Sequence, residues 1–154
     1  MRVYLIRHAD AVDAEDNPAR PLSARGIKQA KALAKFLKLS GAFAPEEIWH
    51  SPLARSRETA ELLVKHLRLK VPLMLVPGLE PDDDVAAIAA RLKACAHPLA
   101  IVGHEPQLGA LATLLITGRM EPVKFTMKKC AALAFEGIGQ NWSVRWHISP
   151  ELLA

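Results

Sequence analysis

Short apolar runs alternate with amphipathic stretches along this chain. The apolar runs are rich in branched and aromatic residues and predict buried strands; they cover 3–6, 47–50, 71–76 and 99–102. The amphipathic stretches repeat apolar residues at helical spacing and predict helices; they cover 23–39, 51–67, 82–95 and 106–116. Towards the C-terminus, 131–135 and 143–148 alternate like two strands joined across a turn at Gly137 and Gly139. This order of elements predicts an α/β fold.

Polar residues and glycines at the edges of these stretches predict where the helices begin and end. Ser23 is expected to cap the first helix, and Gly41 is expected to follow its end. Ser51 is interpreted as the cap of the second helix rather than as a reactive hydroxyl. The acidic run 82–84 is expected to cap the third helix, and Cys95 is expected to lie in the core of that helix.

Length and composition are typical of one globular domain. The chain has 154 residues, of which 51% are hydrophobic and 23% are charged, and it contains no internal repeat, low-complexity segment or linker. We therefore interpret 1–154 as a single domain. Strands that alternate with helices favour a three-layer α/β/α sandwich, in which helices cover both faces of a mostly parallel central sheet.

Charge and cysteine content exclude several classes of protein. The net charge is +4, and no basic cluster alternates with aromatic residues, so nucleic acid is not an expected partner. No apolar run approaches the roughly 20 residues that a membrane helix needs. Cys95 and Cys130 lie far apart, and no secretion signal precedes the first strand. Reduced thiols and a cytoplasmic location are therefore expected.

Cationic and imidazole side chains follow three of the predicted strands. Arg7 and His8 follow the first strand, Arg55 follows the second, and His104 follows the strand at 99–102. Because the carboxyl ends of parallel strands border one crevice, these side chains are expected to converge. Guanidinium groups match phosphate oxygens in bidentate fashion, and a helix start adds backbone N–H donors. The pattern predicts a phosphate site without a metal or cofactor, in which one histidine can attack phosphorus.

Four motifs resemble those of the histidine phosphatase superfamily, and within it the small SixA-like phosphohistidine phosphatases. They are Arg-His-Ala at 7–9, Arg-Pro-Leu-Ser-Ala-Arg-Gly at 20–26, Ser-Pro-Leu-Ala-Arg-Ser-Arg-Glu-Thr at 51–59 and Val-Gly-His-Glu-Pro at 102–106. The resemblance implies a phosphoglycerate mutase-like fold and an enzyme in which His8 becomes phosphorylated. It also implies that Arg7, Arg55 and His104 hold the phosphoryl oxygens. Ala9 stands where the family usually has Gly, and its Cβ would restrict the backbone beside His8 or narrow the site.

Two further side chains have open roles. Arg20 either lines the mouth of the phosphate site or pairs with the acidic residues Asp13, Glu15 and Asp16. Glu80 follows the third predicted strand, where larger superfamily members carry an acid, and is the best candidate for a general acid. The remaining histidines show no ligand spacing and are interpreted as packing or surface residues, so no metal is expected; they are His50, His66, His97 and His147.

These observations favour a metal-independent phosphatase that forms a phosphohistidine intermediate, which water then hydrolyses. The expected substrate is phosphohistidine on a partner protein, because the chain has no insertion that could form a lid over a small metabolite. An imidazole leaving group with a protonated second nitrogen also relaxes the need for a general acid. The alternatives are a broad small-molecule phosphomonoesterase that depends on Glu80, and a phosphate- or phosphoprotein-binding module without turnover. The protein is expected to be a monomer or a weak homodimer.

Overall fold

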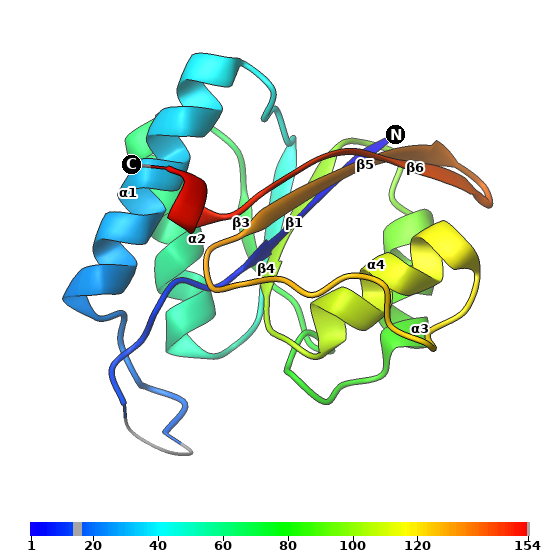
Figure 1. The fold of residues 1–154 in the computed structure, drawn as a ribbon, viewed down its shortest axis with the longest axis horizontal. Helices are drawn as coiled ribbons and strands as arrows, with labels where there is room; N and C mark the ends of the chain where they lie inside the picture. Colours follow the sequence, from blue (N-terminus) through cyan, green and yellow to red (C-terminus); the bar gives the residue numbers. More distant parts are fainter. Residues whose placement is uncertain (14–16, 154) are drawn as a thin grey trace.

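A six-stranded sheet forms the centre of the molecule (Figure 1). The computed structural model describes residues 1–13 and 17–153. The strands are β1 (Arg2–Arg7), β2 (Glu47–His50), β3 (Leu73–Leu75), β4 (Leu99–Gly103), β5 (Ala132–Ile138) and β6 (Asn141–Ile148). The helices are α1 (Ala24–Ser40), α2 (Ala54–Leu67), α3 (Val85–Lys93), α4 (Gln107–Thr117) and the short 3-10 helix η1 (Pro150–Leu152). No helix within the described ranges is long and apolar enough to cross a membrane.

The strand order β3-β2-β4-β1-β5-β6 places β1 in the interior of the sheet. β1 runs parallel to β4, with Arg7 opposite Gly103, and β2 runs parallel to both β4 and β3. β5 and β6 form an antiparallel hairpin, which joins the other side of β1. The mixed, mostly parallel sheet confirms the prediction from the alternation of strands and helices.

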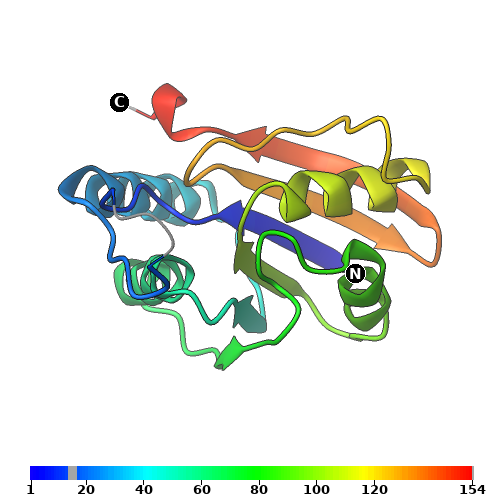
Figure 2. The same cartoon turned by 90° about the horizontal axis from the view of Figure 1, so that it is seen from below.

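Helices cover both faces of this sheet (Figure 2). On one face, α1 and α2 pack against Tyr4 and Ile6 of β1. On the other face, α3 and α4 pack against Val3 and Leu5. Because successive side chains of a strand point to opposite faces, a continuous apolar run suits a strand that is buried on both sides. The predicted three-layer arrangement is confirmed.

Capping residues lie at the predicted ends of two helices. The hydroxyl oxygen of Ser23 accepts the N–H of Gly26 at 3.0 Å, and Gly41 ends α1 in the left-handed conformation. Asp84 caps α3 and accepts the N–H of Ala86 at 3.0 Å. These caps confirm the boundaries that were predicted from Ser23, Gly41 and the acidic run.

The predicted start of the second helix was wrong. α2 begins at Ala54, and its N-cap residue Leu53 makes no side-chain cap bond. Ser51 lies too far before the helix to cap it. Its hydroxyl oxygen accepts the N–H of Leu53 at 3.2 Å and contacts a histidine of the candidate site instead.

Two other local predictions were also wrong. Cys95 lies beyond the end of α3, in a half-buried segment that leads into β4, because the helix stops at the C-cap Ala94. The predicted hairpin turn at Gly137 and Gly139 was correct for Gly139 but wrong for Gly137, which belongs to β5. A Cβ on Gly137 would lie 2.4 Å from the ring of Trp142, so this glycine permits close cross-strand packing rather than a turn.

Candidate active site

The carboxyl ends of β1, β2 and β4 meet at one edge of the sheet. His8 follows β1, Ser51 follows β2 and His104 follows β4, while Arg55 lies in the first turn of α2. The centroids of the His8 and His104 rings are 5.1 Å apart. Burial is the main cause that lowers the pKa of both histidines, and the positive charges of Arg55 and Arg7 add to it. The structure therefore brings together the four side chains that were expected to form the phosphate site.

The backbone orients His8. Its N–H donates to the carbonyl of Gly103 at 2.9 Å, and its ring Nδ1 lies 2.7 Å from the carbonyl oxygen of Ala9. Since a carbonyl oxygen only accepts, Nδ1 carries the proton and Nε2 keeps a lone pair. Burial lowers the pKa of His8 to about 4, so the imidazole is neutral near pH 7. His8 thus offers an unprotonated ring nitrogen, as nucleophilic attack requires.

Ala9 occupies its position without backbone strain. Within the described residues, the non-glycine positions with positive φ are Arg68 and Cys130, so Ala9 has a conformation that L-residues adopt readily. Its N–H donates to Oγ1 of Thr59 at 3.0 Å, and its side chain belongs to the buried apolar cluster beneath α1 and α2. The additional Cβ therefore packs into the core and leaves the orientation of the His8 ring intact.

Ser51 fixes the orientation of the second histidine. Its hydroxyl oxygen lies 2.6 Å from Nε2 of His104, and the same oxygen accepts the N–H of Leu53. Among the described residues the Ser51 hydroxyl proton has no other acceptor, so we assign it to Nε2 and the ring proton of His104 to Nδ1. Burial is the largest cause that lowers the pKa of His104, to about 3, and the neighbouring His8, Arg55 and Arg7 lower it further, so this ring is also neutral near pH 7.

Three buried nitrogen donors at this site have no hydrogen-bond partner in the described part of the chain. They are Nε of Arg7, Nε of Arg55 and Nδ1 of His104. A buried donor without a partner costs about 1–3 kcal/mol, so such a group is usually satisfied by a bound ligand or an ordered water. Both guanidinium groups stay charged, although burial lowers their pKa. A phosphoryl group would satisfy the donors and the positive charge together.

Glu105 anchors the segment that holds Arg7, and the sequence did not reveal this role. Its Oε1 accepts the N–H of Gly109 at 2.5 Å, and its Oε2 accepts the N–H of Met127 at 3.1 Å. The carbonyl of Met127 in turn accepts Nη1–H of Arg7 at 2.9 Å. Glu105 thereby holds α4 and the chain before β5 in the positions that orient Arg7. The only signal for Glu105 in the sequence was that it belongs to the fourth motif, at 102–106.

The glycine of the second motif lets α1 approach the loop after β1. A Cβ on Gly26 would lie 1.9 Å from the carbonyl oxygen of Asp10, so a larger residue does not fit. The hydroxyl of Ser23 donates to Oδ2 of Asp10 at 2.6 Å, and the N–H of Ser23 donates to the Asp10 carbonyl at 3.0 Å. These contacts fix the chain just after His8 against the start of α1.

Arg20 lies at the mouth of the site, where it lines a cleft together with Arg55. Burial lowers the pKa of Arg55, and the charge of Arg20 is the next cause, so the two guanidinium groups are close enough to interact. Asp13 lines the same cleft. The other acidic residues that were considered as partners of Arg20, Glu15 and Asp16, lie outside the described residues.

Glu80 also lines this cleft. Its side chain is exposed, and its backbone N–H donates to Oδ2 of Asp83 at 2.9 Å. The carboxyl group therefore shares a cleft with Arg55 and is open to solvent. This position brings Glu80 to the mouth of the site rather than into its buried part.

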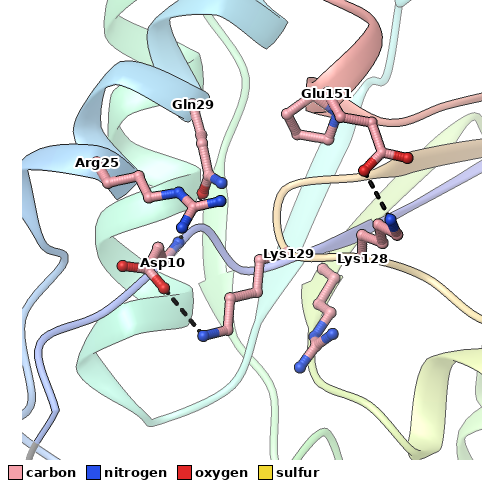
Figure 3. A pocket seen from close by; sticks show the side chains of 8 residues that line it. Asp10, Arg25, Gln29, Lys128, Lys129 and Glu151 are labelled. Atoms are coloured by element: carbon pink, nitrogen blue, oxygen red, sulfur yellow. Dashed lines mark hydrogen bonds and ion pairs between the residues drawn. The ribbon is translucent and has the colours of Figure 1, made fainter.

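Figure 3 shows a second hollow, which includes Arg7. Lys129 Nζ lies 2.9 Å from Oδ1 of Asp10, and Lys128 Nζ lies 2.7 Å from Oε2 of Glu151. Basic side chains outnumber acidic ones in its lining, so the hollow favours anionic groups. The labelled side chains are Asp10, Arg25, Gln29, Lys128, Lys129 and Glu151.

Comparison with known proteins decides the family. Residues 3–80 match the model of the histidine phosphatase superfamily (branch 1). The chain belongs to the histidine phosphatase superfamily. This histidine phosphatase is 30% identical over 155 aligned residues to the phosphohistidine phosphatase SixA of Escherichia coli (strain K12), with 97% of this chain and 94% of the relative covered.

Solved structures of related proteins share the whole fold of this histidine phosphatase. The structure of the protein histidine phosphatase SixA complexed with tungstate superposes with a TM-score of 0.87 and 29% identity, and the match covers 100% of both chains. A putative phosphohistidine phosphatase SixA from Agrobacterium tumefaciens gives a TM-score of 0.82 at 20% identity, with 97% of both chains covered. The predicted family and fold class are confirmed.

Proposed function

We propose that this histidine phosphatase removes phosphoryl groups from phosphohistidine side chains of a partner protein, with His8 as the nucleophile. The observation that carries the proposal is the lone pair on Nε2 of His8 beside buried donors of Arg7, Arg55 and His104 that have no partner among the described residues. Catalysis of phosphoryl transfer depends on positioning the nucleophile and on stabilising the charge of the phosphoryl oxygens. The geometry supports both requirements.

In the first step, Nε2 of His8 attacks phosphorus, and the bond between phosphorus and the leaving nitrogen breaks. His8 keeps its Nδ1 proton because the Ala9 carbonyl accepts it, and it becomes a phosphoimidazolium. Arg7 and Arg55 neutralise the phosphoryl oxygens, and His104 donates its Nδ1–H to one of them. The imidazole of the substrate departs neutral, since its other nitrogen already carries a proton.

In the second step, water attacks phosphorus, and the bond between phosphorus and Nε2 of His8 breaks. A proton of the water passes to the phosphate product or to solvent. His8 departs as a neutral imidazole, because its own proton has stayed on Nδ1. Neither step requires a general acid when the substrate is phosphohistidine.

Two observations support a protein substrate. The relative from Escherichia coli is named a phosphohistidine phosphatase, and a similar solved structure is named a protein histidine phosphatase. The two hollows that border Arg7 and Arg55 carry further basic side chains, which suit a negatively charged partner surface. These basic side chains are Arg20, Arg25, Lys128 and Lys129.

A second candidate function is hydrolysis of small phosphate monoesters. An alkoxide leaving group needs a proton in the transition state, and Glu80 lines the cleft next to Arg55, from which a proton could reach the leaving oxygen. Turnover of phosphate esters would then depend on Glu80, whereas turnover of phosphohistidine would not depend on it.

Phosphate release from a phosphohistidine-bearing protein domain tests the proposal. The wild-type protein should release phosphate, and His8→Ala should lose at least roughly 10³-fold in rate, because the nucleophile is missing. His147→Ala is the matched control, since this histidine is exposed on β6 and should leave the rate unchanged. Equal rates for wild type and His8→Ala, or equal inactivity, would overturn the proposal.

A further inference from the structure

A second cluster of reactive side chains lies at the opposite end of the sheet from His8. Glu47 is the first residue of β2, and Cys95 and His97 lie in the segment between α3 and β4. The phosphate site borders the carboxyl ends of these strands, whereas this cluster borders their amino ends. We call these three residues the Glu47–Cys95–His97 cluster. It is separate from the chemistry proposed above.

The three ligand atoms of the cluster converge on one point. Oε2 of Glu47 lies 2.5 Å from Nε2 of His97, and Sγ of Cys95 lies 3.4 Å from the same nitrogen. All three atoms lie within 4.8 Å of one another. In tetrahedral zinc sites, ligand atoms are about 3.2–3.7 Å apart, given the usual bond lengths. The sulfur–nitrogen distance already matches, and the oxygen–nitrogen distance needs to open by about 1 Å.

Without a cation, two hydrogen bonds can satisfy the cluster. Nε2–H of His97 can donate to Oε2 of Glu47, and the Cys95 thiol can donate to the carbonyl oxygen of His97, 3.7 Å from Sγ. A proton relay from Cys95 to Glu47 is excluded, because it would use both ring nitrogens of His97 and here both partners approach Nε2. A single cation bound to sulfur, nitrogen and oxygen would replace these hydrogen bonds and use the convergence of all three ligand atoms.

The surroundings hold the ligand atoms in place. Oε1 of Glu47 accepts the indole N–H of Trp49 at 2.9 Å, which leaves Oε2 directed towards His97. Burial acts to raise the pKa of Glu47, but the hydrogen bonds from Trp49 and His97 outweigh it and lower the pKa overall. The N–H of Glu46 donates to the carbonyl of Pro98 at 2.9 Å and ties the two segments together. The His97 side chain is 42% exposed, so a cation can enter from solvent.

We propose that Glu47, Cys95 and His97 bind one thiophilic divalent cation, of which Zn²⁺ is the best match, with water as the fourth ligand. A thiolate, an imidazole and a carboxylate form a mixed donor set that suits zinc and disfavours Mg²⁺ and Ca²⁺. Binding releases the thiol proton of Cys95 to solvent. The sequence did not predict this site, because Glu47 is 50 positions from His97 and no ligand spacing joins them.

Titration of the reduced, metal-free chain with Co²⁺ tests the proposal, because a thiolate bound to Co²⁺ gives a charge-transfer absorption band. We expect one equivalent of Co²⁺ to produce this band and Zn²⁺ to displace it. Cys95→Ser should abolish the band, and His97→Asn should weaken binding at least about tenfold. His147→Asn is the control and should bind like wild type. The other thiol, Cys130, is buried and its pKa is raised to about 12, so it is a poor ligand.

The absence of a charge-transfer band with the wild-type chain would overturn the site, and so would a band that persists in Cys95→Ser. Binding of Co²⁺ without a thiolate band would assign the cation to another location and would also contradict the proposal. A second measurement does not depend on cobalt. Zn²⁺ should raise the Tm of the wild type and should raise that of His97→Asn much less. Metal-free His97→Asn should release phosphate at the wild-type rate. The metal-site proposal and the proposed function of His8 can therefore fail independently of each other.

Discussion

The hydroxyl oxygen of Ser51 lies 2.6 Å from Nε2 of His104, although 53 positions separate the two residues in the chain. The contact joins the ends of the parallel neighbours β2 and β4, and both residues are buried. It places the proton of His104 on Nδ1, the atom that has no other partner in the described residues. Ser51 therefore acts through His104 and is a positioning residue for the phosphate site.

Ser51→Ala should lower kcat for phosphate release by about fivefold. Without the hydroxyl, the proton of His104 is no longer held on Nδ1, and the loss of one buried hydrogen bond is worth about 1 kcal/mol. KM should change less, because Arg7 and Arg55 still bind the phosphoryl group. Ser40→Ala, at the end of α1, is the control. An unchanged kcat for Ser51→Ala would exclude the positioning role.

On the acidic side of the pH–rate profile, kcat/KM should fall with an apparent pKa near 4. Burial lowers the pKa of His8 to about 4, so the reactive neutral form predominates above that pH and is lost as the pH falls through it. Lys129→Gln should move this apparent pKa upward, because the positive charge of Lys129 is one of the causes that lower the pKa of His8. Measurement of kcat/KM against pH checks both expectations. An apparent pKa near 6.5, the ordinary pKa of histidine, would contradict the proposed environment of His8.

Gly26→Ala should destabilise the protein by about 1–3 kcal/mol, because its Cβ would lie 1.9 Å from the carbonyl oxygen of Asp10. Gly103→Ala is the matched control for stability, since its Cβ would meet Leu108 at 3.5 Å, an ordinary contact. Urea denaturation measures both free energies of unfolding. Similar losses for the two variants would show that the approach of α1 to Asp10 is not the cause.

Glu80→Gln should separate the two candidate functions. An amide cannot donate a proton to an alkoxide, so turnover of small phosphate esters should fall by about 10²-fold or more if Glu80 is the general acid. Phosphohistidine turnover should remain, because the imidazole leaves neutral. Parallel assays with both substrates check this prediction. Loss of both activities would place Glu80 in the hydrolysis of phosphohistidine as well.

Much of the fold was predictable because local signals agreed with the tertiary structure. The apolar run of β1 identified a strand buried on both faces, and Ser23 and Gly41 marked the ends of α1 through capping chemistry. The prediction at Ser51 was wrong for a physical reason. Serine before a helix is usually a cap, but here its hydroxyl is used by His104, which the fold brings from a distant segment.

The candidate site was predictable only in part. Strand ends identified Arg7, His8, Arg55 and His104, because parallel topology converts separate strand ends into one crevice. Contacts between distant loops were not predictable, since no local pattern encodes them. Glu105 reaches the N–H of Met127, and the Glu47–Cys95–His97 cluster forms only when β2 and β4 pair.

Trapping of the phosphorylated intermediate tests the central claim most directly. The protein would be mixed with a phosphohistidine-bearing domain labelled on phosphorus, quenched at alkaline pH within one turnover, digested and mapped by mass spectrometry. The account predicts an acid-labile phosphoryl group on His8 of the wild type and none on His8→Ala. Phosphate release without a phosphoryl group on His8, or labelling of a different residue in the wild type, would contradict it.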